Sequence, residues 1–121
     1  MCMAWAVIFH DEFDSEFEEL PEKVQDRIYT LLGVLEQEGP DWGRPRVDTL
    51  NGSEFDNMKE LRVSVGKSVW RVAFAFDLER QAILLCAGDK AGENEKRFYK
   101  RLIATADKRF KGHQASLKKE K

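Results

Sequence analysis

The chain has 121 residues, 42% of them hydrophobic and 35% charged, with a net charge of −2 and two cysteines. This size predicts one domain with a core of its own, and no run approaches the roughly 18 apolar residues of a membrane-spanning helix. Cys2 and Cys86 are too few for a disulfide framework, and the apolar start of the chain lacks the basic leader of a secretory signal. We therefore expect a cytoplasmic protein with no membrane partner, in which Cys86 is a small buried hydrophobic side chain.

The two halves of the chain differ strongly in charge. Residues 1–61 hold 15 Asp and Glu against 5 Lys and Arg, whereas residues 62–121 hold 7 against 15. A basic second half can present a phosphate-binding surface even on a nearly neutral protein. The alternative is that the two halves neutralise each other when the chain folds.

Hydrophobic periodicity predicts a strand and two helices in the first third of the chain. The strand covers residues 4–10, and one apolar stripe marks a short acidic helix over about 11–19. A second helix starts at Pro21, which suits a first helical position, and stops at the Gly-Pro pair of residues 39–40.

Turn residues and alternation organise the remainder of the chain. Residues 40–57 have no sustained period and predict a loop, held to the core by Val47 and Leu50. Alternating and continuous apolar runs then predict three strands, and a 3.6-residue period predicts a helix. Their ranges are 58–65, 69–77 and 81–88 for the strands and about 93–110 for the helix.

The resulting order β-α-α-β-β-β-α predicts an α+β fold over residues 1–112. Its apolar faces are best buried by a mainly antiparallel sheet with a helical hairpin on one face and a C-terminal helix. Residues 113–121 are polar, and we expect them to form a disordered tail.

Two arginines, Arg62 and Arg71, lie inside the first two strands of this sheet. A two-residue turn at residues 67–68 places the large apolar side chains of both strands on one side. Arg71 then lies opposite Ser64 and Arg62 opposite Ala73, because a slip of one residue would reverse a whole strand. Both arginines are thus expected on the polar face of the sheet.

We expect this polar face to be a shallow basic cleft that the helices leave uncovered, with Lys90 at its rim. Small alanines beside the arginines favour a concavity. The alternative is that Arg62 and Arg71 only form salt bridges, with Glu60 or Glu79 as partners.

Basic residues also gather on the last predicted helix, where they either contact phosphate groups of a partner or form an ordinary solvated face. They are Lys96, Arg97, Lys100, Arg101, Lys108, Arg109 and Lys111. His10 is expected to be a surface or capping residue and His113 an inert residue of the tail. No motif predicts a metal or a cofactor.

Two segments together resemble HigB-type, phage-derived toxins of the RelE/ParE superfamily. They are GRPRVDTLNGSEFDNMKELRV and VWRVAFAFDLERQAILLCAGDK, and the similarity spans about residues 5–110. The resemblance implies a RelE-like fold and a metal-independent endoribonuclease that cuts messenger RNA on the ribosome. It also implies attack by a ribose 2′-hydroxyl on the adjacent phosphate, and an antitoxin partner, often of the helix-turn-helix type.

The same resemblance implies functional residues. Arg71 matches the arginine that contacts the scissile phosphate, Arg62 lies at the ELR position, and Lys90 matches a basic position after the last strand. Tyr99 or Phe98 matches an aromatic residue that stacks on a base. The residues implied to contact RNA are Lys59, Lys96, Arg97, Phe98, Lys100 and Arg101.

The chain departs from the family pattern where RelE carries two strand lysines. Met58 and Glu60 occupy those positions, and Lys59 has the opposite parity, so the usual general base is missing. Two alternatives therefore remain: a ParE-like gyrase poison that cuts no RNA, and an inactive relic that only binds an antitoxin.

Overall fold

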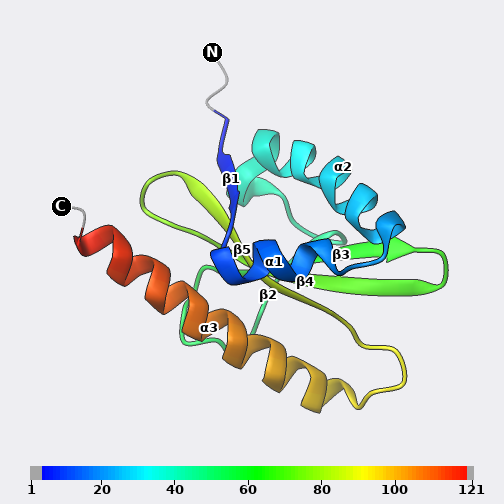
Figure 1. Ribbon diagram of the computed structural model, residues 1–121. Helices are drawn as coiled ribbons and strands as arrows, with labels where there is room; N and C mark the ends of the chain where they lie inside the picture. Colours follow the sequence, from blue (N-terminus) through cyan, green and yellow to red (C-terminus); the bar gives the residue numbers. More distant parts are fainter. Residues whose placement is uncertain (1–3, 120–121) are drawn as a thin grey trace.

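The computed structural model describes residues 4–119, which form a five-stranded sheet with helices packed on both faces (Figure 1). The strand order is β1-β5-β4-β3-β2, with β1 parallel to β5 and the other neighbours antiparallel. The predicted α+β class with a mainly antiparallel sheet is therefore confirmed. The elements are β1 (Ala6–Phe9), α1 (Asp11–Glu18), α2 (Glu22–Glu38), the short 3-10 helix η1 (Gly39–Asp41), β2 (Val47–Thr49), β3 (Met58–Val65), β4 (Ser68–Phe76), β5 (Gln81–Asp89) and α3 (Glu95–Lys119).

One face of the sheet packs against α1 and α2. Leu61 of β3 and Phe74 of β4 point to this side, where they share a core with Phe13 of α1 and Ile28 of α2. Strand side chains alternate between faces, so the residues between these apolar positions point to the opposite face. The helical hairpin was predicted correctly as the cover of one face.

The opposite face is covered by α3. Ala73 and Ala75 of β4 form a second core with Leu102, Ala106 and Phe110 of the helix. We expected this face to stay uncovered and the alanines to leave a shallow concavity. That expectation was wrong, because the small side chains instead let the helix approach the sheet closely.

The C-terminal helix is longer than predicted. It continues past Phe110 to Lys119, so residues 113–119 are helical where a disordered tail was expected, and residues 120–121 lie outside the described range. His113 Nε2 lies 2.9 Å from Oδ2 of the buried Asp77. The polar composition of this segment gave no sign of this contact, because Asp77 lies in a turn far away in the chain.

The predicted loop 40–57 contains the edge strand β2. Val47 pairs with Leu61 of β3, and both Val47 and Leu50 are buried, as expected. A strand of three residues is too short for alternation to reveal.

Cys86 is buried as predicted, and burial raises the pKa of its thiol to about 12, while Cys2 lies outside the described residues. None of the helices within residues 4–119 is long and apolar enough to cross a membrane.

His10 caps the N-terminus of α1, as predicted. Its Nδ1 accepts a hydrogen bond of 3.1 Å from the backbone N–H of Glu12, which requires that nitrogen to be unprotonated. Burial, followed by the nearby charge of Arg109, lowers the pKa of His10 below its ordinary 6.5.

Acidification is therefore expected to destabilise the protein through His10. The unfolded chain takes up a proton near pH 6.5 that the folded state resists, so the stabilisation is complete above that pH and is lost as the pH falls through the lowered pKa. His10→Asn keeps a capping oxygen that does not titrate, and caps typically contribute about 1 kcal/mol. Urea unfolding above and below pH 6.5 should show that acidification lowers the free energy of unfolding less in the variant than in the wild type. Equal decreases in the two proteins would contradict this role.

Candidate active site

The β3–β4 hairpin determines how the two arginines meet. Its turn consists of Gly66 and Lys67, with Val65 paired to Ser68. Gly66 adopts a φ of +59°, and glycine is the residue that takes this conformation without strain at the first position of such a turn.

Arg62 lies directly opposite Arg71 in this register. The turn lies one residue earlier than predicted, so the expected pairings with Ala73 and Ser64 were wrong by two positions. The prediction that both arginines share one face is confirmed, because a shift of two residues leaves every side chain on its original side.

Arg71 is held on two sides. Its Nη1 donates to the carbonyl oxygen of Val69 at 2.8 Å, and its Nε donates to the hydroxyl of Tyr99 at 2.8 Å. These two hydrogen bonds hold the guanidinium in place, and the side chain as a whole remains 14% exposed. An arginine held this way is prepared to bind an anion with little loss of side-chain freedom.

Glu60 lies between the two arginines. Its Oε2 is 3.6 Å from Nη2 of Arg62, and its Oε1 is 3.9 Å from Nε of Arg71. Arg62 also lies 3.7 Å from Asp48 on β2. Like charges directly opposite each other repel, and the carboxylates offset that repulsion. Ion pairs with Glu60 are therefore present, as one reading of the sequence expected, and they partly neutralise these arginines.

Tyr99 presents its hydroxyl to Arg71 and Glu60. The Tyr99 hydroxyl donates to Oε1 of Glu60 at 2.7 Å while it accepts from Arg71. Phe98 is only 3% exposed and packs in the core beneath α3, so it cannot stack on a base. Of the two aromatic residues, Tyr99 is therefore the one whose polar end lies beside the arginine pair.

Close packing at Gly88 positions this part of α3. Gly88 pairs with Arg71 across the strands, and a Cβ added to it would lie 2.9 Å from Cε1 of Phe98. Gly88→Ala is expected to displace Phe98 and to destabilise the fold by about 1–3 kcal/mol, as overpacking does.

Gly33→Ala is the matched control for Gly88→Ala. Nothing lies within 4 Å of a Cβ added at Gly33, which is in the middle of α2, so this change should stabilise the protein by about 0.5–1 kcal/mol. Urea denaturation measures the free energy of unfolding of both variants. Equal effects of the two substitutions would exclude the proposed contact with Phe98.

The environment of Tyr99 raises the pKa of its phenol. Burial contributes most, and the hydrogen bond to Glu60 and the charge of Glu60 act in the same direction, against a smaller opposing effect of Arg71. The phenol is therefore protonated at neutral pH, and its proton is directed at Glu60.

Two predicted lysines occupy different positions relative to this cluster. Lys90 immediately follows β5, two residues after the Gly88 that pairs with Arg71. Lys59 is paired with Phe74 and its Nζ donates to Oγ1 of Thr49 at 3.0 Å. Since Phe74 points to the α1–α2 face, Lys59 lies on the side of the sheet away from Arg71.

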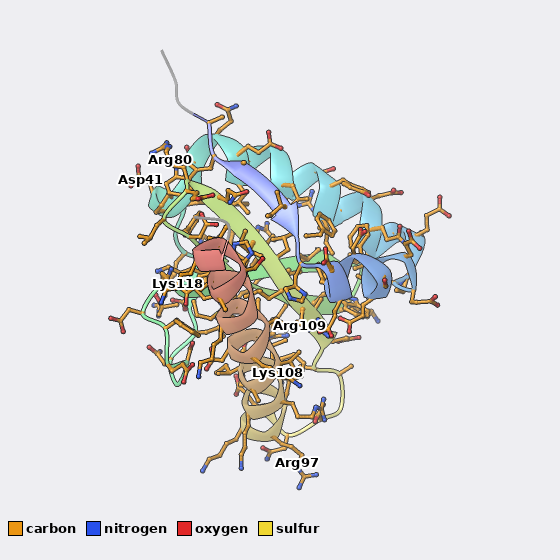
Figure 2. The ribbon with its side chains drawn as sticks, turned by 60° about the vertical axis from the view of Figure 1, so that its left-hand side comes forward. Asp41, Arg80, Arg97, Lys108, Arg109 and Lys118 are labelled. Carbon is orange, nitrogen blue, oxygen red and sulfur yellow. The ribbon has the colours of Figure 1, made fainter. Side chains whose placement is uncertain are left out.

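The basic residues of α3 divide into two groups. Lys96, Arg97 and Lys100 are exposed, and Figure 2 shows Arg97 projecting from the N-terminal end of the helix. Arg101 is also exposed but pairs with Glu93 through two contacts of 2.5 and 2.9 Å.

Arg109 joins the basic helix to the acidic one (Figure 2). Its guanidinium contacts Glu16 at 2.6 and 2.8 Å and Glu12 at 2.9 Å, and it also donates to the backbone oxygen of Leu85. Lys111 similarly pairs with Glu54 at 3.2 Å. The two halves of the chain therefore neutralise each other in part, while the first turns of α3 retain a basic surface.

Sequence reasoning missed the central position of Glu60. Glu60 was noted only as the residue at a position where RelE carries a lysine and as one possible salt-bridge partner. It nevertheless lies two residues from Arg62 and so shares its face of the strand. That spacing was the available signal. Within residues 4–119, no group of three or more His, Cys, Asp or Glu side chains is arranged to hold a metal ion.

Residues 15–111 match the family model described as "Phage derived protein Gp49-like (DUF891)". The chain belongs to this family. It is 47% identical over 111 residues to the Mycobacterium tuberculosis protein named as toxin HigB3, covering 92% of this chain and 95% of the relative. It is also 45% identical over 103 residues to the one named as toxin HigB2 of the same organism, covering 84% of this chain and 51% of that relative. The resemblance to HigB-type proteins is confirmed.

Solved structures of RelE toxins share the fold. A mutant of the E. coli toxin RelE in the free state has a TM-score of 0.61 at 17% identity, over 88% of this chain and 98% of that one. The RelBE2 toxin–antitoxin complex of Mycobacterium tuberculosis gives 0.55 at 17% identity, over 75% and 97%. The archaeal RelE–RelB complex of Pyrococcus horikoshii gives 0.54 at 19%, over 74% and 99%. At these identities the likeness establishes the RelE-like fold alone.

Proposed function

We propose that this protein is the toxin of a type II toxin–antitoxin pair and that it cuts messenger RNA on the ribosome. The observation that carries the proposal is the cluster in which Arg62 and Arg71 face each other across two strands, with the Tyr99 hydroxyl bonded to Arg71. Family relatives named as toxins over nearly the whole chain support the same function.

In the proposed reaction Arg71 binds the scissile phosphate, while Arg62 and Lys90 add positive charge. Guanidinium groups bind phosphate through parallel hydrogen bonds and remain charged at any relevant pH. Fixed positive charge stabilises the extra negative charge of the pentacoordinate phosphorus, by about 3 kcal/mol for a well-placed donor. The ribosome would supply the alignment of the 2′-hydroxyl with the phosphate, which is itself a large catalytic term.

The exposed basic residues at the start of α3 are proposed to contact RNA phosphates. Lys96, Arg97 and Lys100 suit this role because they are exposed, and Arg101 can join them if it leaves Glu93. Lys59 lies on the other side of the sheet from Arg71, so any contact it makes with RNA is remote from the cleavage site.

The proposed protein partner is an antitoxin, with a helix-turn-helix protein as the expected type. Two of the fold relatives were solved as complexes with their antitoxins, which supports an antitoxin here. The ribosome and its messenger are the other proposed partners, and they place the action of the protein in the cytoplasm.

A second candidate is a protein of this fold that cuts no RNA. Glu60 partly neutralises the arginine pair at 3.6 and 3.9 Å, and this favours either an inactive antitoxin-binding relic or a gyrase poison. Without a nucleolytic centre, the fold would act through binding alone.

Primer extension on messenger RNA after induction of the protein separates these functions. The proposed nuclease produces new 5′ ends within translated messages, and they disappear when translation is blocked before induction. A gyrase poison instead yields gyrase-linked DNA breaks with intact messages. A relic produces neither and leaves growth unaffected. Either of the last two results would refute the proposal.

A further inference from the structure

We infer that Tyr99 and Glu60 form a proton relay in which Tyr99 Oη takes the proton of the attacking 2′-hydroxyl and passes its own proton to Glu60. This inference rests on the proposed nuclease function. It supplies the general base that the sequence pattern lacks and gives Glu60 a role beyond that of an ion-pair partner.

The geometry directs the Tyr99 proton to one acceptor. The hydroxyl accepts from Nε of Arg71 at 2.8 Å, so its own hydrogen points to Oε1 of Glu60 at 2.7 Å. An oxygen that donates once and accepts once retains one lone pair. A phosphate bound by Arg71 brings its neighbouring ribose close to that oxygen, because Arg71 and Tyr99 are in direct contact.

Chemistry excludes the other members of the cluster as proton acceptors. Arg62 and Arg71 remain protonated at neutral pH, and Lys59 lies on the opposite face of the sheet. Glu60 is the carboxylate in contact with both arginines and with Tyr99, and its side chain is only 5% exposed. Its charge is balanced by the two guanidinium groups, which explains how a carboxylate is tolerated there.

The relay step conserves protons and electron pairs. The 2′ oxygen forms a bond to phosphorus as its proton moves to Tyr99 Oη and the Tyr99 proton moves to Glu60 Oε1. The bond from phosphorus to the 5′ oxygen breaks, and that oxygen takes a proton from water. Glu60 then releases its proton to water through Tyr99. The products are a 2′,3′-cyclic phosphate and a free 5′-hydroxyl.

Glu60→Gln tests the relay, because glutamine has similar size and can still accept the Tyr99 hydrogen bond but cannot take up a proton. On messenger-loaded ribosomes at saturating enzyme, the cleavage rate should fall roughly 100-fold or more, the usual contribution of a general base. Ribosome binding should change less than about twofold. The pH profile of the cleavage rate should differ between the wild type and the variant, because the variant lacks the carboxylate that accepts the proton.

Two further variants keep the test specific. Tyr99→Phe should lose about as much activity as Glu60→Gln, and the double variant should lose little more, because residues acting as one unit are not additive. Glu79→Gln changes an exposed glutamate in the β4–β5 turn and should leave the rate and its pH dependence unchanged.

A spectroscopic titration tests the coupling without any cleavage. The chain has two tyrosines, so in a Tyr29→Phe background the phenolate absorbance reports Tyr99 alone. Adding Glu60→Gln should lower the pKa of Tyr99, because the hydrogen bond and charge of Glu60 raise it.

An unchanged titration of Tyr99 overturns the relay. So does an unchanged cleavage rate and pH profile in Glu60→Gln while the wild type cuts RNA. If the wild type itself cuts no RNA, the proposed function and the relay both fall, whereas an unchanged titration alone overturns only the relay.

Discussion

Replacing Arg71 by alanine is expected to abolish messenger cleavage, with a loss of at least about 100-fold in rate, as for removal of one well-placed donor to a developing anion. Its guanidinium is held by Val69 and Tyr99 at the position proposed to receive the scissile phosphate. Arg71→Lys keeps the charge but loses the planar fork of donors, so it should recover only a small part of the activity. Growth arrest on induction and primer extension measure the effect.

The control for Arg71→Ala is Lys23→Ala, which removes a positive charge from an exposed position of α2. This helix packs on the opposite face of the sheet, so the control should remain fully toxic. Both variants should keep the far-ultraviolet circular dichroism of the wild type. Full toxicity of a folded Arg71→Ala protein would show that the arginine pair is not the active site.

Replacing Asp77 by alanine is expected to destabilise the fold by about 2–4 kcal/mol, the range for removing one partner of a buried polar network. The carboxylate accepts hydrogen bonds from the backbone N–H groups of Glu79 and Gln81 at 2.9 and 3.0 Å and from the Gln81 side chain at 2.9 Å. It also contacts His113 at 2.9 Å. These contacts close the β4–β5 turn and anchor the last turns of α3 to it, so removal of the carboxylate destabilises both the turn and the end of the helix.

Urea denaturation of Asp77→Ala and Glu79→Ala provides the comparison. Glu79 is exposed in the same turn, and its replacement should change the free energy of unfolding by less than about 0.5 kcal/mol. His113→Ala should cost less than Asp77→Ala, and its effect should largely vanish in the Asp77→Ala background, because the two residues share one interaction. Additive effects would show that the contact between them contributes little.

Most of the secondary structure followed from local patterns. Strand alternation and turn residues located β3, β4 and β5 to within one residue at each end, because those strands are long and one or both of their faces are buried. The short β2 and the last turns of α3 were missed for a common reason. Each is stabilised by a distant partner, Leu61 in one case and Asp77 in the other, and no local period records such contacts.

The sequence predicted that the two arginines share one face of the sheet, but it did not predict which residues surround them. Parity along β3 and β4 is enough to place Arg62 and Arg71 on one face, and that conclusion holds despite an error of two residues in the predicted register. Parity could not reveal that α3 covers this face, because two alanines are compatible with either an open surface or a closely packed helix. The distinction between Phe98 and Tyr99 depends on that packing.

The sequence by itself determined the α+β class, the shared face of the arginines and the asymmetry of charge, because each is a property of local order or composition. Only the tertiary structure decided which charges meet. Arg109 is neutralised by residues of α1, whereas Arg62 and Arg71 converge on Glu60 and Tyr99. These pairings join residues up to 97 positions apart, and strand register and helix packing, which no short stretch of sequence encodes, determine them.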